Sequence, residues 1–528
     1  MPTTNPNAAG NRYAEVVGTY TVNQAVETKC FQQQYVYPGF AVWEKVKTCI
    51  TAFIRQRKHI YNGGWGIHYF LKTIDPKLMI YDESDLCDSS DFDMFGPSPA
   101  TDLYDLGVLL RQQLPDMNFT IGSGMHPNQY TIMVNFMGVK LVDWIYLSPK
   151  LYAFLPSVKY ANGVVGLHPI VELSRHFFLL SNIFLLPPDK DLSKVVKRVS
   201  LLEKYAFVPW LKDRKLWTAA DLAKARAVAC APYPTPAAAT AALVALQKGL
   251  RADWVPKFDH ACVAGQLAYL EHDRQASADR FVAMDVVVHD ASFVKCMTSV
   301  ASYLRAACAR AKIDPGDVTF VAQNAFIGVV GPLYNGWIEC RYRDATFLKV
   351  FSLASPVHVS SRKTKCCSYF FNMAHMFWWT LYLLFTKRTA EAGIFTQMIG
   401  LTYGGYRAQP KHDLYTVHVD KAHAIGVLPV RNFYMMNNMM RQHNMGLKYT
   451  LDKKTGANAA NTANANAKKG NKKGRAFSEM DYGYKEYEGQ VLFTKKLTEA
   501  TDWNDMPSLP YLYGRIPKKT QEKEKNGK

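Results

Sequence analysis

Three aspartates and two glycines are the residues of this 528-residue chain whose types and spacing could do chemistry. Asp91 and Asp93 are separated by one apolar residue, Asp143 lies in a later apolar stretch, and Gly63-Gly64 precede all three. Residues i and i+2 of a strand point to the same face, so the first two carboxylates can act on one ion. Glycines let backbone N–H groups approach a phosphate closely.

This combination suits phosphoryl transfer assisted by two metal ions. The transition state spreads negative charge over the phosphoryl oxygens, and two divalent ions about 3.5–4 Å apart can hold the attacking and leaving oxygens. Carboxylate oxygens are hard ligands of the kind that Mg²⁺ prefers. We therefore predict that Asp91, Asp93 and Asp143 bind two Mg²⁺ or Mn²⁺ ions. Gly63 and Gly64 are predicted to let the backbone approach the triphosphate of a nucleotide.

The surrounding pattern predicts a small mixed sheet with helices packed on it. Thr101 is the predicted cap of a helix that runs to residue 114. The other expected elements, in chain order, are a helix at 37–57, a strand at 59–61, a helix opening at 67–72, strands at 78–81 and 91–95, and two or three strands within 119–147.

Paired glycines, an Asp-x-Asp pair and a later lone Asp identify the nucleotidyltransferase fold. Residues 54–64 and 125–146 more closely resemble the poly(A) polymerases of large cytoplasmic DNA viruses, the giant-virus and poxvirus catalytic subunits. The close resemblance covers roughly residues 40 to 180. Two departures stand out. Asn62 is inserted between Tyr61 and the glycines, and Trp65 replaces the phosphate-contacting serine of many nucleotidyltransferases.

The resemblance implies an α+β fold, with a polymerase beta-like catalytic nucleotidyltransferase domain followed by a degenerate second nucleotidyltransferase-like domain. It implies template-independent transfer of AMP from ATP to the 3′-hydroxyl of viral mRNA, in the host cytoplasm at the viral factory and in the virion. The giant-virus relatives imply a homodimer, and the poxvirus relatives imply a viral processivity subunit. The second domain would help to form the RNA groove and the subunit contacts.

Residues 255–360 contain a faded copy of the catalytic pattern. A glycine, Gly265, precedes an apolar stretch in which Asp285 echoes the first carboxylate and Val287 stands at the second position. Lys349 or Val350 falls where the third carboxylate would be. Such a copy could not hold two metal ions.

The net charge of +19 and the pI near 9.3 favour a polyanionic partner, nucleic acid before membrane. The ten cysteines include no C-x-x-C pair, so we expect reduced thiols rather than a zinc site or a disulfide framework. The apolar segment 370–385 is shorter than the ~20 residues that a bilayer requires. We therefore interpret it as a buried helix and expect no membrane association.

We expect five regions along the chain. They are a flexible arm at 1–30, the catalytic domain at 31–188, the inactive second domain with helical additions at 189–452, a disordered basic linker at 453–475, and a docking segment with a basic tail at 476–528. Glu172, Arg175 and His176 are interpreted as a helix face whose polar groups satisfy one another.

Two other functions remain open at this stage. One is a basic RNA-binding or virion-associated protein whose catalytic site is dead, although the intact set of aspartates argues against it. The other is an RNA-dependent RNA polymerase, because Asp285 and Asp290 match the spacing of a palm-domain first motif. No Gly-Asp-Asp hairpin follows them, which disfavours this reading.

Overall fold

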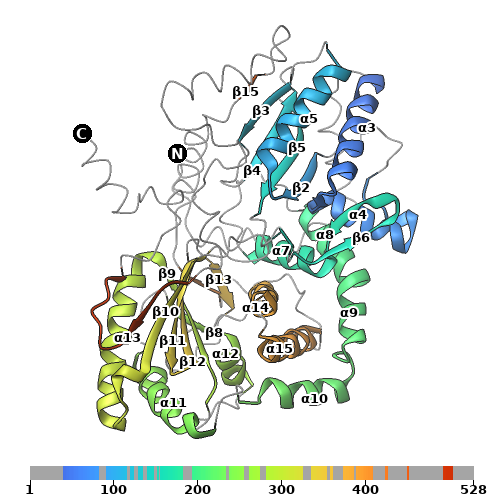
Figure 1. Ribbon diagram of the computed structural model, residues 1–528. Helices are drawn as coiled ribbons and strands as arrows, with labels where there is room; N and C mark the ends of the chain where they lie inside the picture. The colour runs from blue at the N-terminus through green and yellow to red at the C-terminus, as the bar shows by residue number, and fades with distance from the viewer. Residues whose placement is uncertain are drawn as a thin grey trace, which may run out of the picture.

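The computed structural model places two large β-sheets one above the other, each with its own helices (Figure 1). A small third sheet pairs β13 (Val357–Ser360) with β14 (Ala422–Ile425). The N-terminal arm, the acidic loop at 82–90 and the basic linker at 453–475 lie outside the residues that the structure describes. The described residues are 40–81, 91–115, 119–123, 129–134, 139–147, 152–153, 155–181, 193–232, 237–254, 261–273, 281–324, 334–353, 357–360, 373–385, 388–407, 422–425, 449–450 and 491–503.

The first sheet has eight strands in the order β15-β3-β4-β5-β2-β1-β7-β6. Within it, β2 lies between β1, which is antiparallel to it, and β5, which is parallel. Carboxylates on β2 and β5 therefore become neighbours. The bounds are β1 Ile60–Tyr61, β2 Phe92–Gly96, β3 Phe119–Ser123, β4 Gln129–Val134, β5 Val139–Tyr146, β6 Ser157–Lys159, β7 Val165–Leu167 and β15 Tyr449–Thr450.

Helix α3 (Phe40–Arg57) shows why the first helices form where they do. Its apolar residues Val46, Ile50, Phe53 and Ile54 recur at helical spacing and are buried, so one face packs on the domain. The helix ends at Arg57. The next residue, Lys58, has a φ of +57°, and the chain enters β1 two residues later. The other helices of this half are α4 (Gly63–Ile74), α5 (Pro99–Gln113) and α7 (Pro169–Ser181).

The second sheet repeats the first in its strand order, β16-β10-β11-β12-β9-β8. As in the first sheet, β8 is antiparallel to β9, and β9 is parallel to β12. The bounds are β8 Ala261–Ala264, β9 Met284–His289, β10 Val318–Asn324, β11 Tyr334–Tyr342, β12 Ala345–Leu353 and β16 Val491–Lys496, with helices α11 Ala237–Gly249, α12 Gly265–His272 and α13 Asp290–Ala311. The predicted α+β fold with a second, degenerate unit is confirmed.

Helices join the two halves, and one buried apolar core extends through both sheets. These helices are α8 Ser193–Leu202, α9 Val208–Asp213, α10 Ala219–Ala229, α14 Met373–Phe385 and α15 Thr389–Arg407. Helix α14 contacts α7 and buries Trp378 and Trp379 completely, so the predicted buried helix is present. No helix in the described part of the chain is long and apolar enough to span a bilayer.

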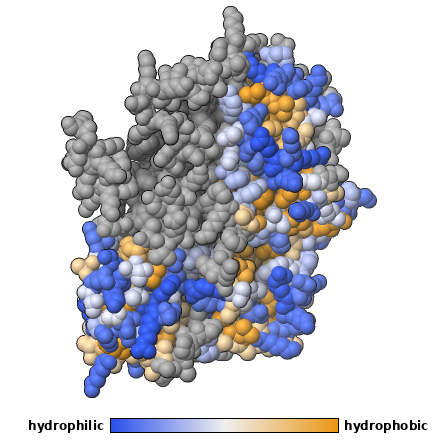
Figure 2. Space-filling view, viewed as in Figure 1, coloured by the Kyte–Doolittle hydropathy of each residue, from blue (hydrophilic) through white to orange (hydrophobic). Residues whose placement is uncertain are grey.

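Three local predictions were wrong. The helix expected to open at 67–72 begins at Gly63, so the paired glycines are its first residues. Residues 78–81 form no strand, because Pro76 starts a short 3₁₀ helix over Pro76–Leu78 and the chain then bends. Helix α5 begins at Pro99 after Ser98 rather than after Thr101, since proline fits the first helical turn and its φ suits the helix. Figure 2 shows hydrophobic residues gathered in patches at the level of α4, β6 and α8, between more hydrophilic stretches.

Candidate active site

The three predicted carboxylates meet at one end of the first sheet. Asp93 on β2 lies directly opposite Asp143 on β5, and Asp91 immediately precedes β2. One ligand oxygen from each lies within 4.8 Å of the others. All three donors are carboxylate oxygens, the ligand type that divalent cations such as Mg²⁺ prefer, and they are close enough together to share an ion. Asp143 is only 2% exposed, and a buried carboxylate needs a compensating partner.

The glycine turn closes over these carboxylates. Gly63 has a φ of +60°, the left-handed region that glycine adopts without strain. A Cβ atom at this position would lie 2.8 Å from Oδ2 of Asp93, so a side chain here would displace the carboxylate. Gly63 and Gly64 are the first residues of α4, and the N-terminal end of a helix is a favourable place for a phosphate.

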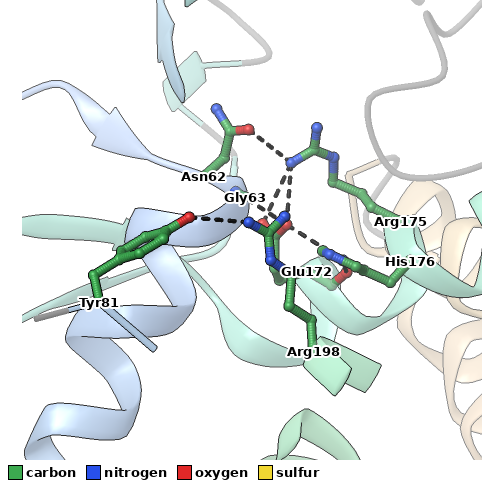
Figure 3. Close-up of polar contacts among 7 residues, drawn as sticks. All are labelled: Asn62, Gly63, Tyr81, Glu172, Arg175, His176 and Arg198. Carbon is green, nitrogen blue, oxygen red and sulfur yellow. Dashed lines mark hydrogen bonds and ion pairs between the residues drawn. The ribbon is translucent and has the colours of Figure 1, made fainter. Parts of the chain in front are cut away.

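Helix α7 holds the turn in place through two charged residues (Figure 3). Oε1 of the buried Glu172 accepts the Gly63 N–H at 3.1 Å. Nη1 of Arg175 donates to Oδ1 of Asn62 at 2.9 Å and lies 3.3 Å from both carboxylate oxygens of Glu172. These residues do satisfy one another, as predicted, but they also fix the turn that the sequence assigned to triphosphate binding. The inserted Asn62 thereby gains a structural role.

His176 lies one helical turn after Glu172 on α7 and makes the stability of the folded protein depend on pH. Its Nδ1 is 2.8 Å from the carbonyl oxygen of Glu172. Burial lowers the pKa of His176 to about 4, although the charge of Glu172 opposes the shift. Because this pKa is depressed below the unfolded value near 6.5, the unfolded chain binds more protons between pH 6.5 and 4. Stability must therefore fall as the pH falls through this window.

We expect the free energy of unfolding of the wild type to lose about 3 kcal/mol relative to His176→Gln between pH 6.5 and 4. The glutamine cannot take up the proton that penalises the folded state. Urea denaturation of both proteins at several pH values measures the difference. If the free energies of unfolding of the two proteins changed in parallel between pH 6.5 and 4, His176 would not be held neutral in the folded state.

Arg198 is a cation of this site that the sequence did not reveal. It comes from α8, and its Nη2 donates to the hydroxyl of Tyr81 at 3.0 Å. A Cβ atom on Gly64 would lie 2.6 Å from the same Nη2, so the arginine lies against the glycine pair. Burial disfavours its charge, but Tyr81, Asp93 and Glu172 outweigh burial and raise the pKa of Arg198. A fixed positive charge thus faces both the carboxylates and the glycine turn.

No motif marks Arg198, since it lies in a short amphipathic helix among other basic residues. Helix α8 falls in the region predicted as the start of the second domain, yet it packs on α7 and α4.

The second sheet carries a counterpart in which an ammonium group takes the place of a carboxylate. Asp285 on β9 lies opposite Lys349 on β12, just as Asp93 lies opposite Asp143. Asp285 therefore occupies the second carboxylate position, not the first, and the prediction that put Val287 there was wrong. Of the two residues predicted for the third position, Lys349 and Val350, the structure places Lys349 there.

Both members of this pair are completely buried. Burial raises the pKa of Asp285 to about 7, and Lys349 is the largest influence that opposes the shift. The Lys349 ammonium also lies 4.9 Å from the ring centroid of Trp379 and favours ionisation of Glu339, whose pKa is lowered despite its burial. A buried lysine at this position excludes the arrangement of carboxylates found in the first sheet.

Lys349→Met should destabilise the protein by about 3–5 kcal/mol at pH 8, because it leaves the buried Asp285 carboxylate without the cation that faces it. The loss should be smaller at pH 6. A carboxyl whose folded pKa is raised from about 3.9 to about 7 loses stability as the pH rises through that window, and removal of the lysine raises the folded pKa further.

Denaturant titrations at both pH values provide the measurement. The double variant Asp285→Asn/Lys349→Met is the control, because it removes both charges and should lose most of the pH dependence. Equal losses at pH 6 and pH 8 in the single variant would contradict this assignment of the pair.

The fold is of the nucleotidyltransferase type. The structure is similar to the crystal structure of the Megavirus polyadenylate synthase, with a TM-score of 0.62 over 90% of this chain and 92% of that one. The sequence identity of 16% means that this likeness concerns the fold.

Residues 48–183, about a quarter of the chain, match the family model of the poly(A) polymerase catalytic subunit, which confirms the predicted resemblance over these residues. A putative poly(A) polymerase catalytic subunit of African swine fever virus is 27% identical over 172 residues, covering 32% of this chain and 34% of that protein. Its counterpart in Acanthamoeba polyphaga mimivirus is 32% identical over 102 residues, covering 19% of this chain and 16% of that protein. The chain thus spans about a third or less of the length of these relatives.

Proposed function

We propose that this protein extends RNA at its 3′ end, transferring AMP from ATP without a template and releasing pyrophosphate. The observation that carries the proposal is the set of three carboxylates, with ligand oxygens within 4.8 Å, beside a glycine turn. The resemblance of residues 48–183 to poly(A) polymerase catalytic subunits supports the choice of ATP and RNA. The net charge of +19 suits a nucleic-acid partner.

The reaction joins the RNA 3′-oxygen to the α-phosphorus of ATP, breaks the bond from that phosphorus to the pyrophosphate, and releases the hydroxyl proton. Asp91, Asp93 and Asp143 would hold two Mg²⁺ or Mn²⁺ ions, which when bound supply positive charge to the attacking and leaving oxygens. Gly63 and Gly64 leave room for the triphosphate to approach the backbone.

Two residues outside the predicted set complete the proposal. Arg198, fixed by Tyr81, would place a positive charge beside the phosphates as negative charge accumulates on the leaving pyrophosphate. Glu172 would keep the turn in position by accepting the Gly63 N–H. Neither residue exchanges a proton with the substrate in this scheme.

Extension of a labelled short RNA with each of the four NTPs and Mg²⁺ or Mn²⁺ tests the proposal. Tails formed from ATP alone are the expected result. Tails from another nucleotide would keep the transfer reaction and overturn the choice of ATP. No extension by a folded preparation at either metal would favour the RNA-binding protein that lacks catalysis.

The predicted homodimer, viral processivity subunit and viral-factory location remain predictions. Light scattering of the purified chain would give its mass in solution, and twice 59.7 kDa is the expected value for the homodimer. The environment of Asp285 argues against the RNA-dependent RNA polymerase. Asp285 faces a buried lysine, in a sheet that repeats the order of the first.

A further inference from the structure

A cavity of about 610 Å³ lies behind the candidate active site, between one face of α3 and one face of α4. Phe92 and Trp65 form part of its wall. Phe92 separates Asp91 from Asp93 in the sequence, and consecutive strand residues point to opposite faces. The cavity and the carboxylates therefore lie on opposite faces of the start of β2, and no step described above uses the cavity.

The charged residues that line this cavity are all cations. Lys47 and Arg55 come from α3, and Lys72 comes from the end of α4. No aspartate or glutamate is among the described residues that line it. Arg55 and Lys72 are exposed to solvent. This composition favours an anionic ligand, and the volume is within the usual range for a small-molecule site.

Aromatic rings that also line this cavity offer flat surfaces on which a base could stack. Trp65 stacks on Phe92 with centroids 4.9 Å apart and planes 18° apart. Tyr69 and Tyr160, which also line the cavity, lie nearly parallel, with an interplanar angle of 27° and centroids 6.5 Å apart. Aromatic rings beside cations are the combination by which proteins hold single-stranded nucleic acid, with bases stacked on rings and phosphates near positive charges.

We propose that this cavity binds a nucleotide unit of single-stranded RNA, with its base against the tyrosine rings and its phosphate near Arg55 and Lys72. A strand held here and at the carboxylates would pass around the start of β2. This proposal concerns RNA binding and does not require AMP transfer. Measurements of binding affinity therefore test it without an activity assay.

The test compares the full-length wild type with Arg55→Gln/Lys72→Gln, by fluorescence anisotropy of a labelled 15-nucleotide RNA at several salt concentrations. Each phosphate contact on a single strand contributes about 0.7 to the slope of log affinity against log salt. Loss of two contacts should therefore reduce the slope by about 1.4 and weaken binding at least about fivefold at low salt. Both residues are exposed, so the variant should fold normally, which thermal melting checks.

The matched control is Lys224→Gln/Lys295→Gln, which removes the same charge from exposed positions on α10 and α13. It should change the RNA affinity less than twofold. A second arm measures binding of a fluorescent ATP analogue, which the cavity variant should leave unchanged. Equal RNA binding by the two double variants would overturn the proposal. So would a cavity variant that loses the ATP analogue and keeps RNA, because the cavity would then hold a free nucleotide.

Discussion

Asp93→Asn should reduce AMP transfer to RNA by more than about 100-fold, since even residues that only support a metal ligand contribute 10–100-fold. Asp93 lies directly opposite Asp143, and its Oδ2 is the atom that Gly63 leaves room for. Asparagine keeps the shape and removes the charge, so the site should lose affinity for cations without losing its fold. Rates of single-nucleotide extension, measured beside thermal melting curves, give the result.

Asp285→Asn is the matched control, because Asp285 holds the equivalent position in the second sheet. It removes one carboxylate charge from a buried strand and should leave the rate per folded molecule within about twofold of the wild type, since no ion is proposed to bind beside Lys349. If both substitutions reduced the rate equally, the distinction between the two sheets would be wrong.

Gly63→Ala should abolish activity and also lower stability. The left-handed conformation costs a residue with a Cβ atom about 1–2 kcal/mol. The new methyl group would also meet Asp93 at 2.8 Å and push the carboxylate away from its partners. The expected result is a lower melting temperature together with a loss of extension that exceeds any loss of folded protein.

Gly265→Ala separates the two effects. Gly265 opens α12 with a φ of +67°, and a Cβ atom there would collide with the carboxylate of Asp285. This variant should lose a similar amount of stability yet retain its rate per folded molecule. If Gly63→Ala were as active as Gly265→Ala, the turn at Gly63 would not be part of the active site.

The main elements of the site could be predicted from the sequence because each depends on local spacing. A strand alternates its faces, so Asp91 and Asp93 had to act together, and an apolar stretch around Asp143 had to be a strand. Paired glycines after a short strand gave the turn. The order of these pieces was enough to indicate the fold.

The residues that support the turn could not be predicted, because they come from distant parts of the chain. Glu172 meets Gly63 from 109 residues away, and Arg198 meets Tyr81 from 117 residues away. Each contact depends on how α7 and α8 pack on α4, and no local pattern records that packing. A charged residue on an amphipathic helix looks the same in the sequence whether it faces water or a site.

The error over Asp285 has a related cause. A shift of one residue along a strand turns every side chain to the other face, and the apolar pattern reveals it. A shift of two residues preserves the faces, so Asp285 could be assigned to the first or the second carboxylate position. Only the pairing of Asp285 with Lys349 across β9 and β12 decides between them.

Binding of Mn²⁺ in the presence of ATP, measured by electron paramagnetic resonance, tests the central claim most directly. The account predicts that the wild type binds Mn²⁺ and that Asp143→Asn loses both this binding and AMP transfer. Asp213→Asn, at an exposed position at the end of α9, should retain both. Undiminished Mn²⁺ binding by Asp143→Asn would contradict the claim that the three aspartates form the metal site.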